Sequence, residues 1–183
     1  MKSKSISTGD LCMMGVFTAI IAVMAQIIIP MPYGVPMTLQ TLAIPLAGIM
    51  LGAKKGAVTA LLYVLVGAVG VPVFAGFNGG LGAVFGPTGG FLMSFPLLAY
   101  TAGYGAEKNN MFWLYGGLAF GVVLNYLCGV IYFSLYTSND LITSFMACVL
   151  LFIPTDILKI IIAGLFGMRI RNLLLHRSIE KAN

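Results

Sequence analysis

The chain consists largely of uninterrupted apolar runs, each of roughly 17 to 25 residues, which is the length a helix needs to cross about 30 Å of hydrocarbon. Hydrophobic residues make up 60% of the chain and charged residues only 8%, whereas a soluble domain is about 25% charged. Lipid cannot satisfy exposed backbone groups, so helices are the expected spanning elements. The sequence therefore predicts an all-α integral membrane protein.

Six spanning helices fit the chain as a single membrane domain over residues 1–183. The expected helices cover residues 11–29, 38–53, 56–71, 91–105, 111–136 and 142–168, and a basic tail follows at 169–183. A glycine-rich segment at residues 71–91 joins the third helix to the fourth.

The basic residues support this arrangement and orient it. If the N-terminus is cytoplasmic, the cytoplasmic segments hold every Lys and Arg except Lys159, namely Lys2, Lys4, Lys54, Lys55, Lys108, Arg169, Arg171, Arg177 and Lys181. This asymmetry follows the positive-inside rule, so we expect both termini in the cytoplasm, the protein in the cell membrane, and the glycine-rich loop outside. The net charge of +5 then fits topology and anionic lipid, without nucleic acid as a partner.

The stretch PTDILKII places Asp156 and Lys159 inside the sixth apolar run. A charge at the centre of a spanning helix costs roughly 3 kcal/mol, so both groups need compensation. They are three residues apart and can pair on one helix face. Two interpretations stay open: a structural ion pair that locks helices together, or a polar ligand or ion site. Pro154 favours the second, because it lacks an N–H and weakens the helix just before the pair.

The glycine-rich segment also has two interpretations. It could be a flexible outer loop, or a compact loop folded back over an outward-facing cavity. Its phenylalanines favour the compact loop, because a solvated linker tolerates them poorly, and glycine allows close backbone approach to a ligand. The chain contains no GK[ST] sequence, so it has no P-loop for ATP hydrolysis.

Small residues recur on the first expected helix at Gly15, Ala19 and Ala22. Such a stripe lets another helix approach closely, either from a partner or from within the chain. Gln40 and Asn125 are further polar side chains inside spans, and hydrogen bonds between helices would account for both.

The residues contain no catalytic constellation. There is no serine–histidine–acid set, no pair of intramembrane carboxylates and no metal cluster, since His176 is far in sequence from Cys12, Cys128 and Cys148. We expect no enzyme activity, no metal and no cofactor. The pattern indicates a binding or transport protein for a compact polar organic ligand, while a membrane scaffold or a small membrane enzyme stays open.

Three stretches together resemble one family: PYGVPMTLQTLAIPLAGIMLG, GVPVFAGFNGGLGAVFGPTGGF and PTDILKIIIAG. They are similar to the BioY family, the biotin-specific substrate-binding subunits (S components) of energy-coupling-factor (ECF) transporters. The resemblance implies a six-helix fold whose vitamin site opens outward, high-affinity biotin uptake, and, as partners, a transmembrane coupling subunit and two ABC ATPases. An S component for another small vitamin is the alternative.

The resemblance also implies site residues. It places biotin near Asp156 and Lys159, under the loop that bears Phe77, Asn78, Gly89 and Gly90, with Gln40 matching the glutamine of the family's TLQT stretch. Gly15, Ala19 and Ala22 resemble the contact surface for the coupling subunit. The ureido ring offers two N–H donors and a carbonyl acceptor, so Asp156 is expected to accept from an N–H. Lys159 could bind the ureido oxygen, which we favour, or the valerate carboxylate; in the first case the carboxylate needs Asn78 and loop N–H groups.

Overall fold

The computed structural model describes residues 7–31 and 35–180, with side chains up to residue 173, and these residues are mostly helical. The helices are α1 (Thr8–Ala25), α2 (Gln40–Leu51), α3 (Ala53–Ala68), α4 (Leu81–Val84), α5 (Gly89–Glu107), α6 (Met111–Thr137), α7 (Leu141–Phe145), the π-helical turn η2 (Met146–Leu150) and α8 (Ile153–Glu180). Two short strands, β1 (Ile28–Ile29) and β2 (Met37–Thr38), form an antiparallel pair. The predicted helical character is confirmed.

The start of α1 differs from the expected boundary at residue 11. The Ser7 side chain accepts a hydrogen bond from the Asp10 backbone N–H, and the Asp10 carboxylate accepts one from the Ser7 N–H. This reciprocal cap satisfies two N–H groups that a helix end leaves free. The helix therefore begins at Thr8.

The end of α1 was also predicted incorrectly, because the helix stops at Ala25 and does not reach residue 29. Ile28 and Ile29 pair with Thr38 and Met37 in the two-stranded sheet. Backbone groups that pair between strands cannot also bond within a helix, so the same pairing delays the start of α2 from residue 38 to Gln40. Apolar composition could not separate these alternatives.

Helices α2, α3 and α5 approach one another closely through glycine. A Cβ atom on Gly48 would lie 2.1 Å from the Ala99 carbonyl oxygen, and one on Gly56 would lie 2.5 Å from the Gly48 Cα atom. The turn between α2 and α3 is a single residue, Gly52, at φ +86°, a conformation that glycine adopts readily. Ile44 and Leu98 are fully buried in the core at this contact.

The expected sixth helix at residues 142–168 is broken. It is divided into α7, η2 and α8, with α8 inclined at 47° to the preceding part. Asp140 caps α7 by accepting from the Thr143 N–H. Hydrogen bonding from the Thr143 side chain, and then from its backbone N–H, holds the pKa of the Asp140 carboxyl below its ordinary value. Pro154 cannot donate a backbone hydrogen bond to the preceding turn, which accounts for the break. Helix α8 then continues through the segment expected to be a tail, as far as Glu180.

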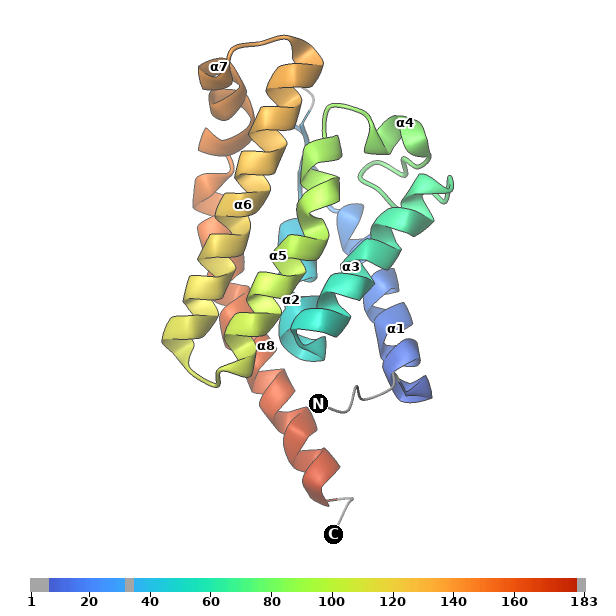
Figure 1. Ribbon diagram of the computed structural model, residues 1–183, viewed down its shortest axis with the longest axis vertical. Helices are drawn as coiled ribbons and strands as arrows, with labels where there is room; N and C mark the ends of the chain where they lie inside the picture. The colour runs from blue at the N-terminus through green and yellow to red at the C-terminus, as the bar shows by residue number, and fades with distance from the viewer. Residues whose placement is uncertain (1–6, 32–34, 181–183) are drawn as a thin grey trace.

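Two of the described helices, α1 and α6, are long and apolar enough to cross a membrane, and the bent α7–η2–α8 segment is a third candidate. Figure 1 shows the start of α1 and the end of α8 in the lower half, with the α2–α3 and α5–α6 connections, while α4 and α7 lie at the opposite end. The loop between α3 and α5 thus lies at the end of the molecule away from the end of α8. Residues 1–6, 32–34 and 181–183, including Lys2, Lys4 and Lys181 of the topology argument, lie outside the described residues.

Candidate functional site

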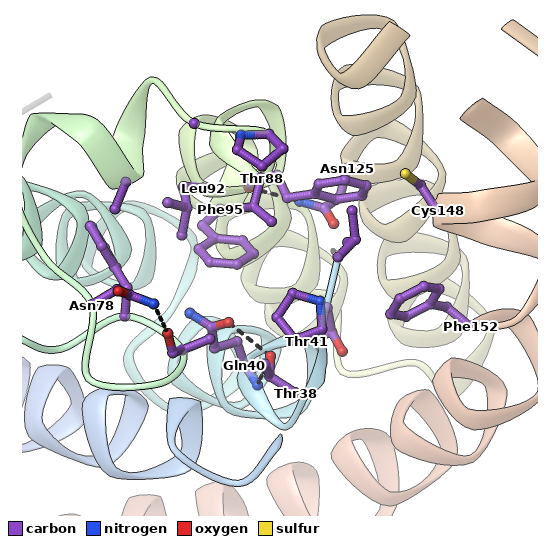
Figure 2. A pocket seen from close by; sticks show the side chains of 18 of the residues that line it. Thr38, Gln40, Thr41, Asn78, Thr88, Leu92, Phe95, Asn125, Cys148 and Phe152 are labelled. Atoms are coloured by element: carbon purple, nitrogen blue, oxygen red, sulfur yellow. Dashed lines mark hydrogen bonds between the residues drawn. The ribbon is translucent and has the colours of Figure 1, made fainter. Parts of the chain in front are cut away.

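A cavity of about 520 Å³ lies between the α3–α5 loop and the helices beneath it. This volume falls in the range of about 300–1,000 Å³ that is usual for small-molecule sites. Figure 2 shows Thr38, Gln40 and Thr41 along one edge of this space, and Leu92, Phe95, Thr88 and Asn125 along the opposite edge. Its polar lining residues are Thr38, Gln40, Thr41, Asn78, Thr88, Asn125, Tyr126, Asp156 and Lys159, and its larger apolar ones are Phe74, Phe91, Leu92, Phe95 and Phe152.

Asp156 and Lys159 form the predicted ion pair in this wall. Their side chains are almost completely buried, and Lys159 Nζ lies 2.7 Å from Asp156 Oδ1. The ammonium also donates to the Thr38 carbonyl oxygen and to Thr41 Oγ1, both at 2.9 Å. An ammonium has three N–H groups, and all three are used within the chain. The predicted pairing is confirmed.

The Asp156 carboxylate keeps some capacity to accept. Its Oδ1 accepts from Lys159 and from the Thr41 hydroxyl at 3.1 Å, and its Oδ2 accepts from the Tyr126 hydroxyl at 2.6 Å. A carboxylate accepts about four hydrogen bonds, so one position on Oδ2 stays open. The unused capacity of the pair is therefore an acceptor on Asp156, and Lys159 has no free donor.

Gln40 connects the pair's surroundings to the loop. Its Oε1 accepts from Thr38 Oγ1 at 2.8 Å, and its Nε2 donates to the Tyr63 hydroxyl at 2.6 Å. The Tyr63 hydroxyl in turn donates to the Val73 carbonyl oxygen at 2.9 Å. Gln40 is thus both a wall residue and part of a hydrogen-bond chain from α2 through α3 to the loop.

The loop is compact and is tied to α1, as the second interpretation of the sequence predicted. Gln26, just after α1, donates to the Phe74 carbonyl oxygen at 3.1 Å and accepts from the Phe77 N–H at 2.8 Å. The Phe74 ring is buried edge-on against Tyr63, with centroids 5.6 Å apart. The Asn78 amide donates to the Ala75 carbonyl oxygen at 2.8 Å. These contacts fix the loop over the cavity.

The structure brings Asp156, Lys159, Gln40 and Asn78 together, and it leaves the other expected ligand residues outside the wall.

Phe77 is 71% exposed, and its backbone adopts a positive φ of +55°. Gly89 and Gly90 instead permit close packing. A Cβ on Gly89 would lie 2.1 Å from the Val84 carbonyl oxygen, and one on Gly90 would lie 2.4 Å from Tyr132 Cβ.

Two contacts of the pair were not predicted from the sequence. Thr41 directly follows Gln40, and Tyr126 directly follows Asn125, so each was adjacent to a residue already singled out. Both touch Asp156, from helices that are 115 and 30 residues away in the chain. Their hydroxyl groups next to intramembrane amides were the only signal available.

The small-residue stripe of α1 is mostly unpacked in this chain. Gly15 and Ala19 are exposed, and no atom lies within 4 Å of a Cβ built on Gly15. Ala22 is partly buried against the core. Internal packing therefore accounts for Ala22 but not for the other two residues.

Comparison with known proteins decides the family, because the BioY family model matches residues 1–176. The chain belongs to the BioY family. A BioY relative from Thermotoga maritima, named biotin transporter BioY, is 39% identical over 165 residues, covering 89% of this chain and 96% of the relative. A probable biotin transporter BioY from Pyrococcus horikoshii is 36% identical over 171 residues, covering 93% and 98%.

A solved structure shares the BioY fold seen here. It is the crystal structure of the S-component for biotin from an ECF-type ABC transporter, with a TM-score of 0.84 and 28% identity, covering 94% of this chain and 95% of that one. The fold is therefore that of an ECF S-component.

Proposed function

We propose that this protein is the high-affinity biotin-binding membrane subunit of an ECF-type ABC importer and takes up biotin from outside the cell. The BioY relatives and the solved S-component support this role by their names. The observation that carries it within the structure is the buried Asp156–Lys159 pair in the wall of a ligand-sized cavity, with acceptor capacity left on Asp156. A ureido head group supplies the N–H donor that such an acceptor needs.

In this proposal Asp156 Oδ2 accepts from one ureido N–H. Lys159 can reach the ureido oxygen only by giving up one of its three bonds, and the Thr41 hydroxyl is the neutral side-chain partner that it exchanges. Gln40 lines the head-group end, and Asn78 with loop N–H groups receives the valerate carboxylate. Phe77, Gly89 and Gly90 lie outside the cavity wall, so in this proposal they shape the loop and do not contact biotin.

The proposal includes six membrane crossings, with both termini in the cytoplasm and the α3–α5 loop outside. Its support is the distribution of Lys and Arg along the sequence, together with the position of α4 away from the end of α8 (Figure 1). In this proposal the membrane that these helices cross is the cell membrane.

The partners in this proposal are a transmembrane coupling subunit and two ABC ATPases, which hydrolyse ATP for transport. Gly15, Ala19 and Ala22 of α1 form the surface for the coupling subunit. The exposure of Gly15 and Ala19 supports this surface, because small exposed residues let a second helix approach closely in lipid.

The test is ligand-dependent thermal stabilisation of the purified protein in detergent, with thiamin and riboflavin as controls. Ligand at 1,000 times its Kd stabilises a protein by about 4 kcal/mol, so biotin alone should raise the unfolding temperature. Stabilisation by a control vitamin alone would indicate an S component for that vitamin. No stabilisation by any of the three would favour a scaffold that uses Asp156 and Lys159 structurally.

A further inference from the structure

Asn125 on α6 lies in the cavity wall and has a fixed orientation. Its side-chain Nδ2 donates to the Phe91 carbonyl oxygen at 3.1 Å and to Ser94 Oγ at 2.7 Å, both on α5. A carbonyl oxygen can only accept, so the nitrogen end of the amide must face Phe91. Both N–H groups of the amide are thereby used, and the position of Oδ1 is set.

The Asn125 oxygen has no hydrogen-bond donor among the described residues. Asn125 is only 2% exposed. Among the described residues, one buried side-chain polar atom has neither a hydrogen-bond partner nor access to open space, and that atom is Ser144 Oγ, not Asn125 Oδ1. Asn125 Oδ1 therefore reaches open space, and the cavity that Asn125 lines supplies it. Figure 2 shows this amide at the edge of the space between the labelled side chains.

We propose that Asn125 Oδ1 accepts a hydrogen bond from an N–H of the bound ligand and selects for ligands with such a donor. Once a ligand fills the cavity, an acceptor that is covered and left unpaired is costly, so a ligand that supplies the donor gains affinity over one that brings lone pairs. The inference rests on the proposed function, since it concerns the same cavity. It assigns Asn125 Oδ1 as the acceptor for the second N–H of the head group.

The cavity then offers two fixed acceptors to a head group with two N–H donors. One is Asp156 Oδ2 on α8, which keeps an open position beside Tyr126, and the other is Asn125 Oδ1 on α6. Neither acceptor suits a ligand carboxylate, which has no proton to donate. The charged tail of the ligand must therefore point away from Asn125.

The alternative is that Asn125 only bridges α5 and α6 through its nitrogen. The two roles separate because they use different atoms of the amide. Ser94→Ala removes a bridging contact and leaves Oδ1 in place, so it is the matched control. Asn125→Leu removes the acceptor and keeps the branched shape of the side chain, and Asn125→Ala removes it without adding bulk near Phe91.

The experiment compares biotin with two cyclic carbamate analogues, each of which replaces one ureido N–H by a ring oxygen. Wild-type protein should bind both carbamates at least tenfold more weakly than biotin, one because of Asp156 and the other because of Asn125. In Asn125→Leu or Asn125→Ala, the preference for biotin over one carbamate should fall at least fivefold, and the preference over the other should persist. Ser94→Ala should keep both preferences.

Several outcomes would overturn the inference. If wild-type protein binds either carbamate as tightly as it binds biotin, the cavity has no acceptor for one of the two ureido N–H groups. This result would reject the inference whatever the variants show. Equal losses for all three ligands in both Asn125 variants would assign the residue to helix packing. If wild-type protein binds no biotin at all, the proposed function fails first, and this result is distinct from both others.

Discussion

Thr41 is the residue that makes the buried charges tolerable, because its hydroxyl bonds to both of them. It accepts from Lys159 and donates to Asp156. Together with the Thr38 carbonyl and the Tyr126 hydroxyl, it replaces the water that either charge would otherwise need. Removing one member of a buried ion pair typically costs about 3–5 kcal/mol, because the other charge stays buried alone.

Asp156→Asn should weaken biotin binding at least tenfold. The variant loses the charged acceptor for a ureido N–H, and such hydrogen bonds contribute about 1.5–3 kcal/mol. Biotin titration by calorimetry, on protein shown to be folded by its thermal unfolding, measures the change. Asp140→Asn, which alters an exposed acid outside the cavity, is the control and should bind normally. Unchanged affinity in a folded Asp156→Asn protein would instead assign the pair to structure.

At the scale of elements, the α3–α5 loop is anchored on both sides, to Gln26 through Phe74 and to Tyr132 through Phe85, while the start of α4 is exposed. Phe74 is buried and bonded to Gln26, whereas Leu81 at the start of α4 is 62% exposed. Glycine makes an empty loop costly to order, so a ligand that touches the loop should shift it toward the closed state.

A nitroxide at Leu81→Cys should become less mobile when biotin binds. The protein for this measurement has Cys12, Cys128 and Cys148 replaced, and mobility is read by electron paramagnetic resonance with and without saturating biotin. A label at Ile142→Cys, exposed on α7 and outside the cavity wall, should not respond. Equal mobility of the Leu81 label in both states would reject a ligand-responsive lid, and labelling from the cytoplasmic face alone would reject the outer position of the loop.

Local sequence rules predicted contacts between residues that are close in the sequence, and missed contacts between residues that are far apart in the sequence. The i, i+3 spacing of Asp156 and Lys159 was enough to predict their pairing. No spacing rule could place Thr41 on Asp156, because their contact spans 115 residues. The β1–β2 pair was missed for a related reason, since isoleucine suits a strand as well as an apolar helix.

At the scale of the whole molecule, the proposed assembly surface is opposite in character to the site. Gly15 and Ala19 are exposed, small and apolar, and they suit close helix contact in lipid. Gln26 connects the end of the same helix to the loop over the cavity. The surface and the site are therefore parts of one connected structure but use different residues.

Ala19→Trp should abolish assembly with the coupling subunit and biotin uptake, while the isolated subunit still binds biotin. The indole blocks close approach of a partner helix, and it points away from the chain's own core. Co-purification with the coupling subunit and uptake of labelled biotin measure the two effects. Ile20→Trp, at an exposed position on another side of α1, should assemble normally. Parallel loss of biotin binding and assembly in Ala19→Trp would indicate internal packing.

The opposite charges of Asp156 and Lys159, held 2.7 Å apart, also bear on how the protein responds to voltage. An elementary charge moved across a membrane potential gains or loses about 2.3 kcal/mol per 100 mV. A rigid displacement of α8 at the level of the pair carries equal and opposite charges, so the field does almost no net work on it. The ureido head of biotin is uncharged and leaves this balance intact. Movement of the empty site should thus be nearly independent of the membrane potential, whereas movement of the occupied site also carries the negative charge of the valerate carboxylate and should depend on it.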